Sequence, residues 1–281
     1  MNPESNQDKS WDLQSSWIIS PGQAKSILQK SGSVFLDSRG LLRRIQVHIP
    51  NSITVQWEDF SESSLPLKGH LLPKEKIASL LNKLNLKEES WIVVVGAGSD
   101  GWGEEGRIVW SLREMGYRKS YWINGGDTAF MKDSTKGIIP IAEIQNKDEY
   151  SFSISKESIQ RSLNSEKFIL IDTREEREYK GATPYGESRG GHIPGSKWIY
   201  FKDFINKDST IKSKIEIDDL LKKNNINKNY LIVPYCTGGV RSAIVTGILI
   251  SYGYQAKNYA GSMWEWSSAN EKDYPLIKSN P

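Results

Sequence analysis

The sequence predicts an α/β protein built from two similar domains in tandem, each with a parallel sheet flanked by helices on both faces. Three observations support this prediction. Short apolar segments suited to buried strands alternate with segments of helical periodicity. The second half of the chain repeats the order of the first, and 281 residues are enough for two domains of ordinary size.

The first half opens at Trp17, and Ser20 is a suitable N-cap for a helix that begins at Pro21. The apolar runs and helical periodicities that follow predict the remaining elements. We expect strands at residues 34–39, 91–95 and 120–123, and helices at residues 71–84 and 108–115.

The second half contains counterparts of these segments. The predicted turn at His192 corresponds to the one at His48, and corresponding residues of the two halves lie 135 to 144 positions apart. A repeat of this length indicates a duplicated domain, because solenoid repeats span only about 20 to 50 residues. We therefore divide the chain into a first domain at residues 11–136, a linker at 137–150 and a second domain at 151–281.

Composition and charge argue against several classes of function. The 37 basic and 34 acidic residues nearly balance, and no basic stripe with interleaved aromatic residues indicates nucleic-acid binding. No apolar run has the length of a membrane-spanning helix, and the polar first 20 residues do not resemble a secretory signal. With one cysteine and three histidines, we expect no metal site, no cofactor and a reducing, cytoplasmic location. The oligomeric state stays open.

The only cysteine, Cys236, lies between a predicted strand and a predicted helix. Residues 231–233 form an apolar run that we expect Pro234 and the two following glycines to end, and helical periodicity extends over residues 243–250. Unpaired backbone amides at the start of a helix favour an anion. We therefore expect the Cys236 thiol to ionise readily.

The loop after Cys236 is suited to holding an anion. Its glycines permit backbone angles that turn several amides toward one point, and Arg241 adds a permanent positive charge. A thiolate in this setting is a nucleophile, and the same cradle can hold a persulfide or the oxyanion of a substrate. The expected active-site loop consists of Thr237, Gly238, Gly239 and Val240.

These residues resemble the active-site loop of the rhodanese family of sulfurtransferases. His-Ile-Pro-Gly at residues 192–195 matches a second family motif, and a C-terminal motif is matched at Tyr259, Gly261, Ser262, Glu265 and Trp266, with Met263 in place of an aromatic residue. The resemblance implies two rhodanese-like domains, of which only the second is catalytic, since Ala97 aligns with Cys236. It also implies that Cys236 accepts sulfur as a persulfide and passes it on in a ping-pong reaction.

The resemblance leaves the donor and the acceptor open. We expect a small anionic donor and a thiol or cyanide acceptor, and we favour thiosulfate because Arg241 raises the positive charge that faces a dianion. Mercaptopyruvate is the alternative donor. A cysteine phosphatase or arsenate reductase fits less well, since the spacing from Cys236 to Arg241 is one residue shorter than the phosphatase loop requires. A further alternative is a persulfide carrier that delivers sulfur to a partner protein without turning over small acceptors.

Three arginines are candidates to bind the donor, because a planar guanidinium matches its oxygens. They are Arg241, Arg174 at the end of a predicted strand, and Arg189 in an insertion before His192. For Arg174 the alternative is a structural ion pair with Asp172. We expect His192 to fix its turn by hydrogen bonds and not to act as a general base.

The first copy of the loop has a different pattern, G-x-G-x-x-G at residues 96–101, which is the form of a dinucleotide-binding loop. A dinucleotide site also needs an acidic residue at the end of the next strand, where this chain has Asn124. We therefore interpret the segment as a degenerate copy of the cysteine loop. The first domain is expected to support the second and to form a wall of its cleft.

Overall fold

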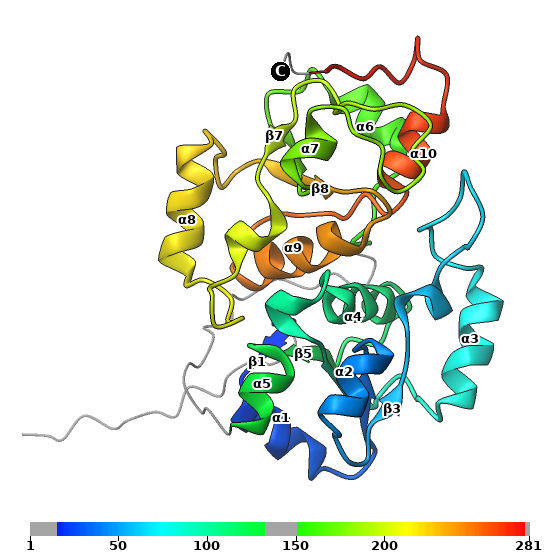
Figure 1. Ribbon diagram of the computed structural model, residues 1–281, viewed down its shortest axis with the longest axis vertical. Coiled ribbons are helices and arrows are strands. Elements are labelled where there is room, and N and C mark those ends of the chain that lie inside the picture. Colours follow the sequence, from blue (N-terminus) through cyan, green and yellow to red (C-terminus); the bar gives the residue numbers. More distant parts are fainter. Residues whose placement is uncertain (1–15, 133–150, 279–281) are drawn as a thin grey trace, which may run out of the picture.

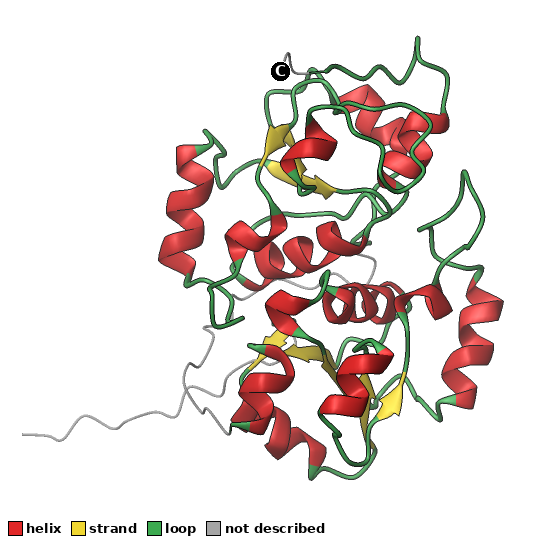
Figure 2. Cartoon of the chain, viewed as in Figure 1, coloured by secondary structure: helices red, strands yellow, loops and turns green. Residues whose placement is uncertain are grey.

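The computed structural model describes residues 16–132 and 151–278, which form two α/β domains packed against each other (Figure 1). Each domain contains a parallel sheet with helices on either side (Figure 2). The predicted fold class is therefore confirmed. The predicted linker at residues 137–150 lies outside the described residues, as do the outermost positions of both predicted domains.

The first domain is a parallel sheet with the strand order β1-β5-β4-β2-β3. Its strands are β1 (Ile18–Ile19), β2 (Ser33–Asp37), β3 (Ile53–Thr54), β4 (Trp91–Val95) and β5 (Ser120–Ile123). Its α-helices are α1 (Pro21–Leu28), α2 (Leu41–Gln46), α3 (Lys74–Lys83), α4 (Glu104–Glu114) and α5 (Gly126–Met131). Two short 3-10 helices are η1 (Trp57–Phe60) and η2 (Gly98–Asp100).

The second domain repeats this topology. Its strands pair in the order β7-β6-β8, and parallel bridges from Ile232 to Ala256 and from Ser153 to Asn258 continue the sheet where β5 and β1 stand in the first domain. The strands are β6 (Phe168–Asp172), β7 (Lys197–Trp198) and β8 (Leu231–Tyr235). The helices are α6 (Lys156–Ser162), α7 (Glu176–Tyr179), η3 (Phe201–Phe204), α8 (Lys214–Lys223), α9 (Val240–Ser251) and α10 (Ser262–Ser268).

Local sequence signals account for many element boundaries. Ser20 Oγ accepts from the Gln23 amide while the Gln23 side chain accepts from the Ser20 amide, and this capping box starts α1 at Pro21 as predicted. The strands predicted at residues 91–95 and 120–123 coincide with β4 and β5. Short apolar runs that fill the centre of a parallel sheet are therefore sufficient to locate these two strands.

The prediction that Pro234 ends its strand is wrong. Strand β8 continues to Tyr235, and Pro234 stands opposite Ile171 of β6. Pro234 has no N–H to donate, but its carbonyl accepts from the amide of Tyr259 (3.1 Å). The ladder therefore lacks one donor and continues, which carries the strand directly to Cys236.

The two domains meet along α4 and α9, which lie side by side between the two sheets (Figure 1). Gly106 makes this close approach possible, since a Cβ at that position would lie 2.5 Å from the Cβ of Ile244. No larger residue fits without moving one helix. The close packing of α4 against α9 places the amino end of α4 beside the cysteine loop.

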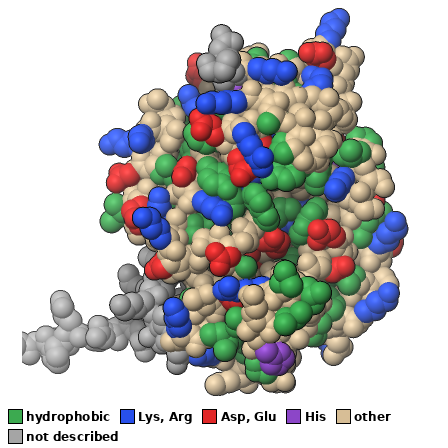
Figure 3. All heavy atoms as spheres, in the orientation of Figure 1, with side chains coloured by type: hydrophobic (Ala, Val, Ile, Leu, Met, Phe, Trp, Pro, Cys, Tyr) green, Lys and Arg blue, Asp and Glu red, His purple; other side chains and the backbone are tan. Residues whose placement is uncertain are grey.

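The surface carries charges of both signs. Acidic and basic side chains are mixed over the face of the molecule shown in Figure 3. Within residues 16–132 and 151–278, no helix combines the length and the apolar character that a membrane crossing requires.

Candidate active site

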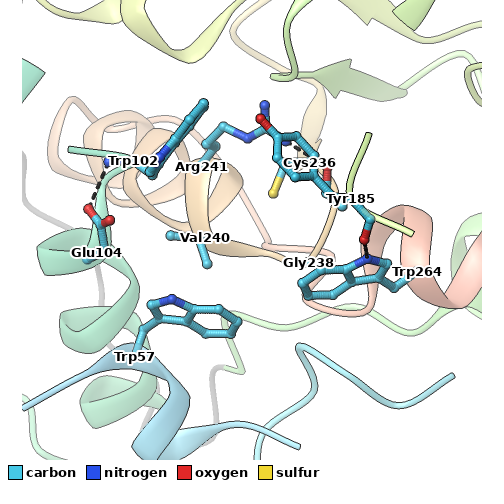
Figure 4. A pocket seen from close by; sticks show the side chains of 10 residues that line it. Trp57, Trp102, Glu104, Tyr185, Cys236, Gly238, Val240, Arg241 and Trp264 are labelled. Carbon is cyan, nitrogen blue, oxygen red and sulfur yellow. Dashed lines mark hydrogen bonds between the residues drawn. The ribbon is translucent and has the colours of Figure 1, made fainter. Parts of the chain in front are cut away.

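A cavity of about 180 Å3 lies between the domains, next to the end of β8 and the start of α9 (Figure 4). Cys236 and the loop after it line one side, together with Tyr185 and Trp264 of the second domain. The first domain contributes Trp57, Trp102 and Glu104. The first domain therefore forms part of the wall, as the sequence predicts.

Cys236 is held by its own loop and by α10. Its side chain is 1% exposed, and its sulfur accepts from the Gly239 amide (3.1 Å). Gly239 has a φ of 80°, a left-handed conformation that favours glycine and that turns this amide toward the sulfur. The Cys236 amide donates to Ser262 Oγ (3.0 Å). The sequence prediction of a thiol cradled by backbone amides matches this geometry.

The electrostatic setting favours the thiolate. Burial would raise the pKa of the Cys236 thiol, but the positive charge of Arg241 and hydrogen bonds from Ser242 and the Gly238 amide outweigh it. The pKa of the thiol therefore lies below its ordinary value. A larger fraction of Cys236 is then in the nucleophilic form at neutral pH.

Alkylation measures this shift directly, because the chain has a single cysteine. We expect the rate of reaction with iodoacetamide to fall as the pH is lowered. The pH at which the rate is half its maximum should be lower for the folded protein than for the same chain unfolded in urea. The rate follows the fraction of thiolate, and a lowered pKa keeps Cys236 ionised at a lower pH. A folded midpoint equal to or above the unfolded one would contradict the assignment.

Arg241 lines the cavity, but its charge is largely balanced. Its guanidinium contacts both carboxylate oxygens of Glu178, at 2.6 and 2.9 Å, and donates to Thr237 Oγ1 at 2.7 Å. Thr237 Oγ1 in turn donates to Glu178 (2.7 Å). Burial would raise the pKa of Glu178, yet the contacts with Arg241 and Thr237 hold it below its ordinary value. This network fixes both ends of the cysteine loop to α7.

Glu178 was not predicted as a site residue. The acidic run at the start of α7 is typical of a solvated helix end, but Glu178 is completely buried beneath the loop. Its neighbours Glu175 and Glu176 have the same residue type and are more exposed. The local sequence therefore contains no signal that separates Glu178 from them.

Arg174 does not reach the cavity. It is completely buried, pairs with Asp172 (2.7 Å) and donates to the carbonyl of Gly191 (2.7 Å). Arg39 and Asp37 form the equivalent pair in the first domain (2.7 Å). The pair occurs in both copies, although only one copy has the cysteine. Arg174 therefore forms a structural ion pair, which was the alternative to donor binding.

Arg189 also lies away from the cavity. Its guanidinium donates to carbonyls at and beyond the end of α10, those of Trp266, Ser267, Ala269 and Tyr274. His192 stacks on Tyr179 (3.7 Å between ring centroids), and its Nδ1 is 2.9 Å from the Tyr179 carbonyl oxygen. The structure therefore brings Cys236 and Arg241 together but leaves Arg174 and Arg189 in supporting positions.

In the degenerate loop of the first domain, an acidic side chain lies over the first glycine. The Glu105 carboxyl occupies the space over Gly96, where a Cβ would lie 2.2 Å from Glu105 Cδ. Burial raises the pKa of Glu105 to about 8. Val95 and Tyr235 end β4 and β8, so Gly96, and not Ala97 as the sequence alignment predicts, is the counterpart of Cys236. Gly103 and Gly239 are the N-caps of α4 and α9, so Glu105 is the counterpart of Arg241, and Trp102 lies in the longer loop before α4.

Arg107 of α4 connects the first domain to the cysteine loop. It is completely buried and donates to the carbonyl of Gly239 (3.2 Å), to Ser61 Oγ (2.9 Å) and to the carbonyl of Gly69. Burial lowers its pKa to about 10, so it stays positively charged at neutral pH. Sequence reasoning missed Arg107, because nothing local distinguishes it from a basic residue on a solvated helix face.

Comparison with known proteins identifies the family. The model of the rhodanese-like domain matches this chain twice, at residues 20–133 and 155–269. The chain belongs to the rhodanese-like family. Both halves match, so the tandem organisation predicted from the repeat is confirmed.

Several relatives of this rhodanese-like chain have names that refer to sulfur transfer. Thiosulfate sulfurtransferase of Azotobacter vinelandii is 26% identical over 268 residues, covering 92% of this chain and 96% of the relative. Sulfur carrier protein TtuD of Thermus thermophilus is 26% identical and covers 79% of this chain and 82% of its own length. Human 3-mercaptopyruvate sulfurtransferase is 25% identical, covering 78% of this chain and 76% of the relative.

Solved structures share the rhodanese-like fold. Wild-type EanB superposes with a TM-score of 0.78 at 17% identity, covering 94% of this chain and 70% of EanB. YnjE superposes with a TM-score of 0.76 at 18% identity and covers 94% of this chain and 69% of its own. At this identity the likeness concerns the fold alone.

Proposed function

We propose that this chain is a sulfurtransferase that moves a sulfane sulfur from thiosulfate to a thiol or to cyanide through a persulfide on Cys236. The observation that carries the proposal is the setting of Cys236. Its sulfur lies at an interdomain cavity, accepts from the Gly239 amide at 3.1 Å and has a lowered pKa. The names of the relatives support the same class of reaction.

The reaction takes two displacement steps. The Cys236 thiolate attacks the outer sulfur of thiosulfate, a new S–S bond forms, and the old S–S bond breaks as sulfite leaves with the electron pair. An acceptor thiolate or cyanide then attacks the outer sulfur of the persulfide, and the electron pair returns to Cys236. No oxidant is consumed, and the kinetics are ping-pong. We place the reaction in the cytoplasm, whose reducing conditions keep the single cysteine as a thiol.

The roles of the other residues follow from their contacts. The amides of Gly238 and Gly239 stabilise negative charge on sulfur, and Arg241 is the arginine that lines the cavity. Because Glu178 balances Arg241, this arginine adds less positive charge than the sequence implied. We retain thiosulfate because the relative with that name covers 92% of this chain, and mercaptopyruvate is the alternative donor.

Mass spectrometry of the intact reduced protein tests this proposal. We expect brief exposure to thiosulfate to add one sulfur atom to the protein, and to do so faster than an equal concentration of mercaptopyruvate. Faster loading by mercaptopyruvate would overturn the choice of donor and retain the class. Loading by neither donor would overturn the sulfurtransferase itself.

A persulfide carrier is the second candidate, because one relative is a sulfur carrier protein. A carrier and an enzyme both load Cys236, so loading does not separate them. We expect the loaded protein to release its sulfur to cyanide repeatedly in the steady state. Loading without such turnover would favour the carrier.

A further inference from the structure

The cavity at Cys236 has aromatic walls. Trp57 and Trp102 come from the first domain, and Tyr185 and Trp264 come from the second (Figure 4). The rings of Trp102 and Tyr185 meet edge to face, with centroids 6.3 Å apart. Both side chains remain about two-fifths exposed, at 42% and 38%, so they border the opening of the cavity.

These rings are held in place without a ligand. Trp264 Nε1 donates to the carbonyl of Tyr185 (2.9 Å), and its indole lies over Gly238, where a Cβ would be 2.0 Å from the ring. Trp102 stacks on Phe201, with centroids 6.2 Å apart. The aromatic walls are therefore preorganised, which lowers the ordering cost for a ligand that packs against them.

The charged groups of the cavity differ from one wall to another, and Lys68 lies over the Trp264 ring, 4.2 Å from its centroid. Arg241 is paired with Glu178 at 2.6 Å and also faces the rings of Trp102 and Tyr185. Glu104 is the acidic side chain on the cavity wall, and it accepts from the Trp102 amide (2.8 Å). No salt bridge to Glu104 is found within the described ranges. An acceptor that carries a carboxylate besides its reacting sulfur would therefore be repelled if that carboxylate lay beside Glu104.

We propose that the sulfur acceptor of this chain is a thiol that carries an aromatic ring and no negative charge apart from the reacting thiolate, with its ring packed between Trp57 and the other aromatic walls. This inference rests on the proposed sulfur transfer and adds the class of acceptor. A cavity of about 180 Å3 accommodates one six-membered ring beside the sulfur. Cyanide or a small hydrophilic thiol would leave the aromatic walls without contact.

The transfer step is balanced for such an acceptor. Its thiolate attacks the outer sulfur of the Cys236 persulfide and forms a new S–S bond. The S–S bond to Cys236 breaks, and the electron pair stays on the Cys236 sulfur. The product is the persulfide of the aromatic thiol, and no further reagent takes part.

The test separates this step from loading by starting with protein already loaded with sulfur. Loss of the extra sulfur is followed in a single turnover with benzyl mercaptan, cyclohexylmethanethiol and 4-(mercaptomethyl)benzoate, and rates are expressed per thiolate. Aromatic pairs contribute roughly 0.5–1.5 kcal/mol beyond buried area. We therefore expect benzyl mercaptan to react about fivefold faster than the saturated thiol, and the benzoate to react more slowly than benzyl mercaptan.

Variants identify the groups responsible. Trp57→Leu keeps an apolar wall and should remove the preference for benzyl mercaptan, while Trp57→Phe should keep it. Trp91→Leu is the matched control, because Trp91 lies at the amino end of β4 in the same domain and does not line the cavity. Glu104→Gln keeps an oxygen for the Trp102 amide and should raise the rate with the benzoate, whereas Glu75→Gln, an exposed change in α3, should not.

The outcomes distinguish the two proposals. If Cys236 does not load with sulfur, the proposed function fails before any acceptor is added. If it loads but reacts equally with benzyl mercaptan and cyclohexylmethanethiol, the aromatic acceptor is overturned and the sulfurtransferase stands. If Trp57→Leu still reacts faster with benzyl mercaptan than with cyclohexylmethanethiol, the proposed binding position of the ring beside Trp57 would also be overturned.

Discussion

Replacement of Cys236 by serine is expected to abolish both persulfide formation and turnover, with a loss of more than about a thousandfold. A serine hydroxyl does not ionise near neutral pH and cannot form the persulfide. The amides around Cys236, including that of Gly239 at 3.1 Å from the sulfur, stabilise charge only after the side chain has supplied it. The remaining loop therefore cannot replace the nucleophile.

The measurement combines intact mass after thiosulfate with the steady-state rate of thiocyanate formation from cyanide. Serine is close to cysteine in size, and the contacts of Arg241 with Glu178 and Thr237 do not involve the thiol. The variant should therefore unfold in urea at nearly the same concentration as the parent protein. A stable Cys236→Ser variant that still gains a sulfur atom would show that the sulfur is carried elsewhere.

Replacement of Glu178 by glutamine is expected to destabilise the fold by about 3–5 kcal/mol, the range for a buried ion pair that loses one partner. Glu178 is completely buried and contacts the Arg241 guanidinium at 2.6 and 2.9 Å. Glutamine has nearly the same shape but no charge. Arg241 would then remain buried without its paired carboxylate, with the Cys236 thiolate as its remaining negative neighbour.

Urea unfolding measures this change, and Glu176→Gln is the matched control on the same helix. Glu176 pairs with Lys180 at 2.9 Å, but both side chains are about half exposed, at 56% and 49%. An exposed i, i+4 pair contributes only about 0.3–0.5 kcal/mol. Equal losses in the two variants would contradict the assignment of Glu178 as the buried counterion of Arg241.

The parts of the structure that the sequence predicts are those set by neighbours along the chain. The capping box at Ser20, the apolar strands and the strand-to-helix junction at Cys236 all depend on residues within a few positions of one another. The fold class and the duplication follow from these local patterns and their repetition. The prediction for Pro234 is wrong because a proline can stay in a strand when its carbonyl has a partner, here Tyr259.

The parts that the sequence does not predict depend on distant contacts. Glu178 meets Arg241 across 63 positions, and Arg107 meets Gly239 across 132. Charged residues of this kind look solvated until the fold places them in the interior. Arg174 illustrates the reverse case. Its place at the end of a strand predicts substrate binding, but in the structure its guanidinium is paired with Asp172 and donates to the Gly191 carbonyl.

The position of Trp102 has a consequence for how this protein can change over time. Trp102 belongs to the loop of the first copy that precedes α4, the counterpart of the cysteine loop, and it lines the cavity at Cys236 in the second copy. Under the proposed function, the sulfur chemistry belongs to the second copy, and the first copy supplies part of the wall that an acceptor would contact. We therefore expect single substitutions in the first copy to change which acceptor reacts while the nucleophile and its cradle stay intact.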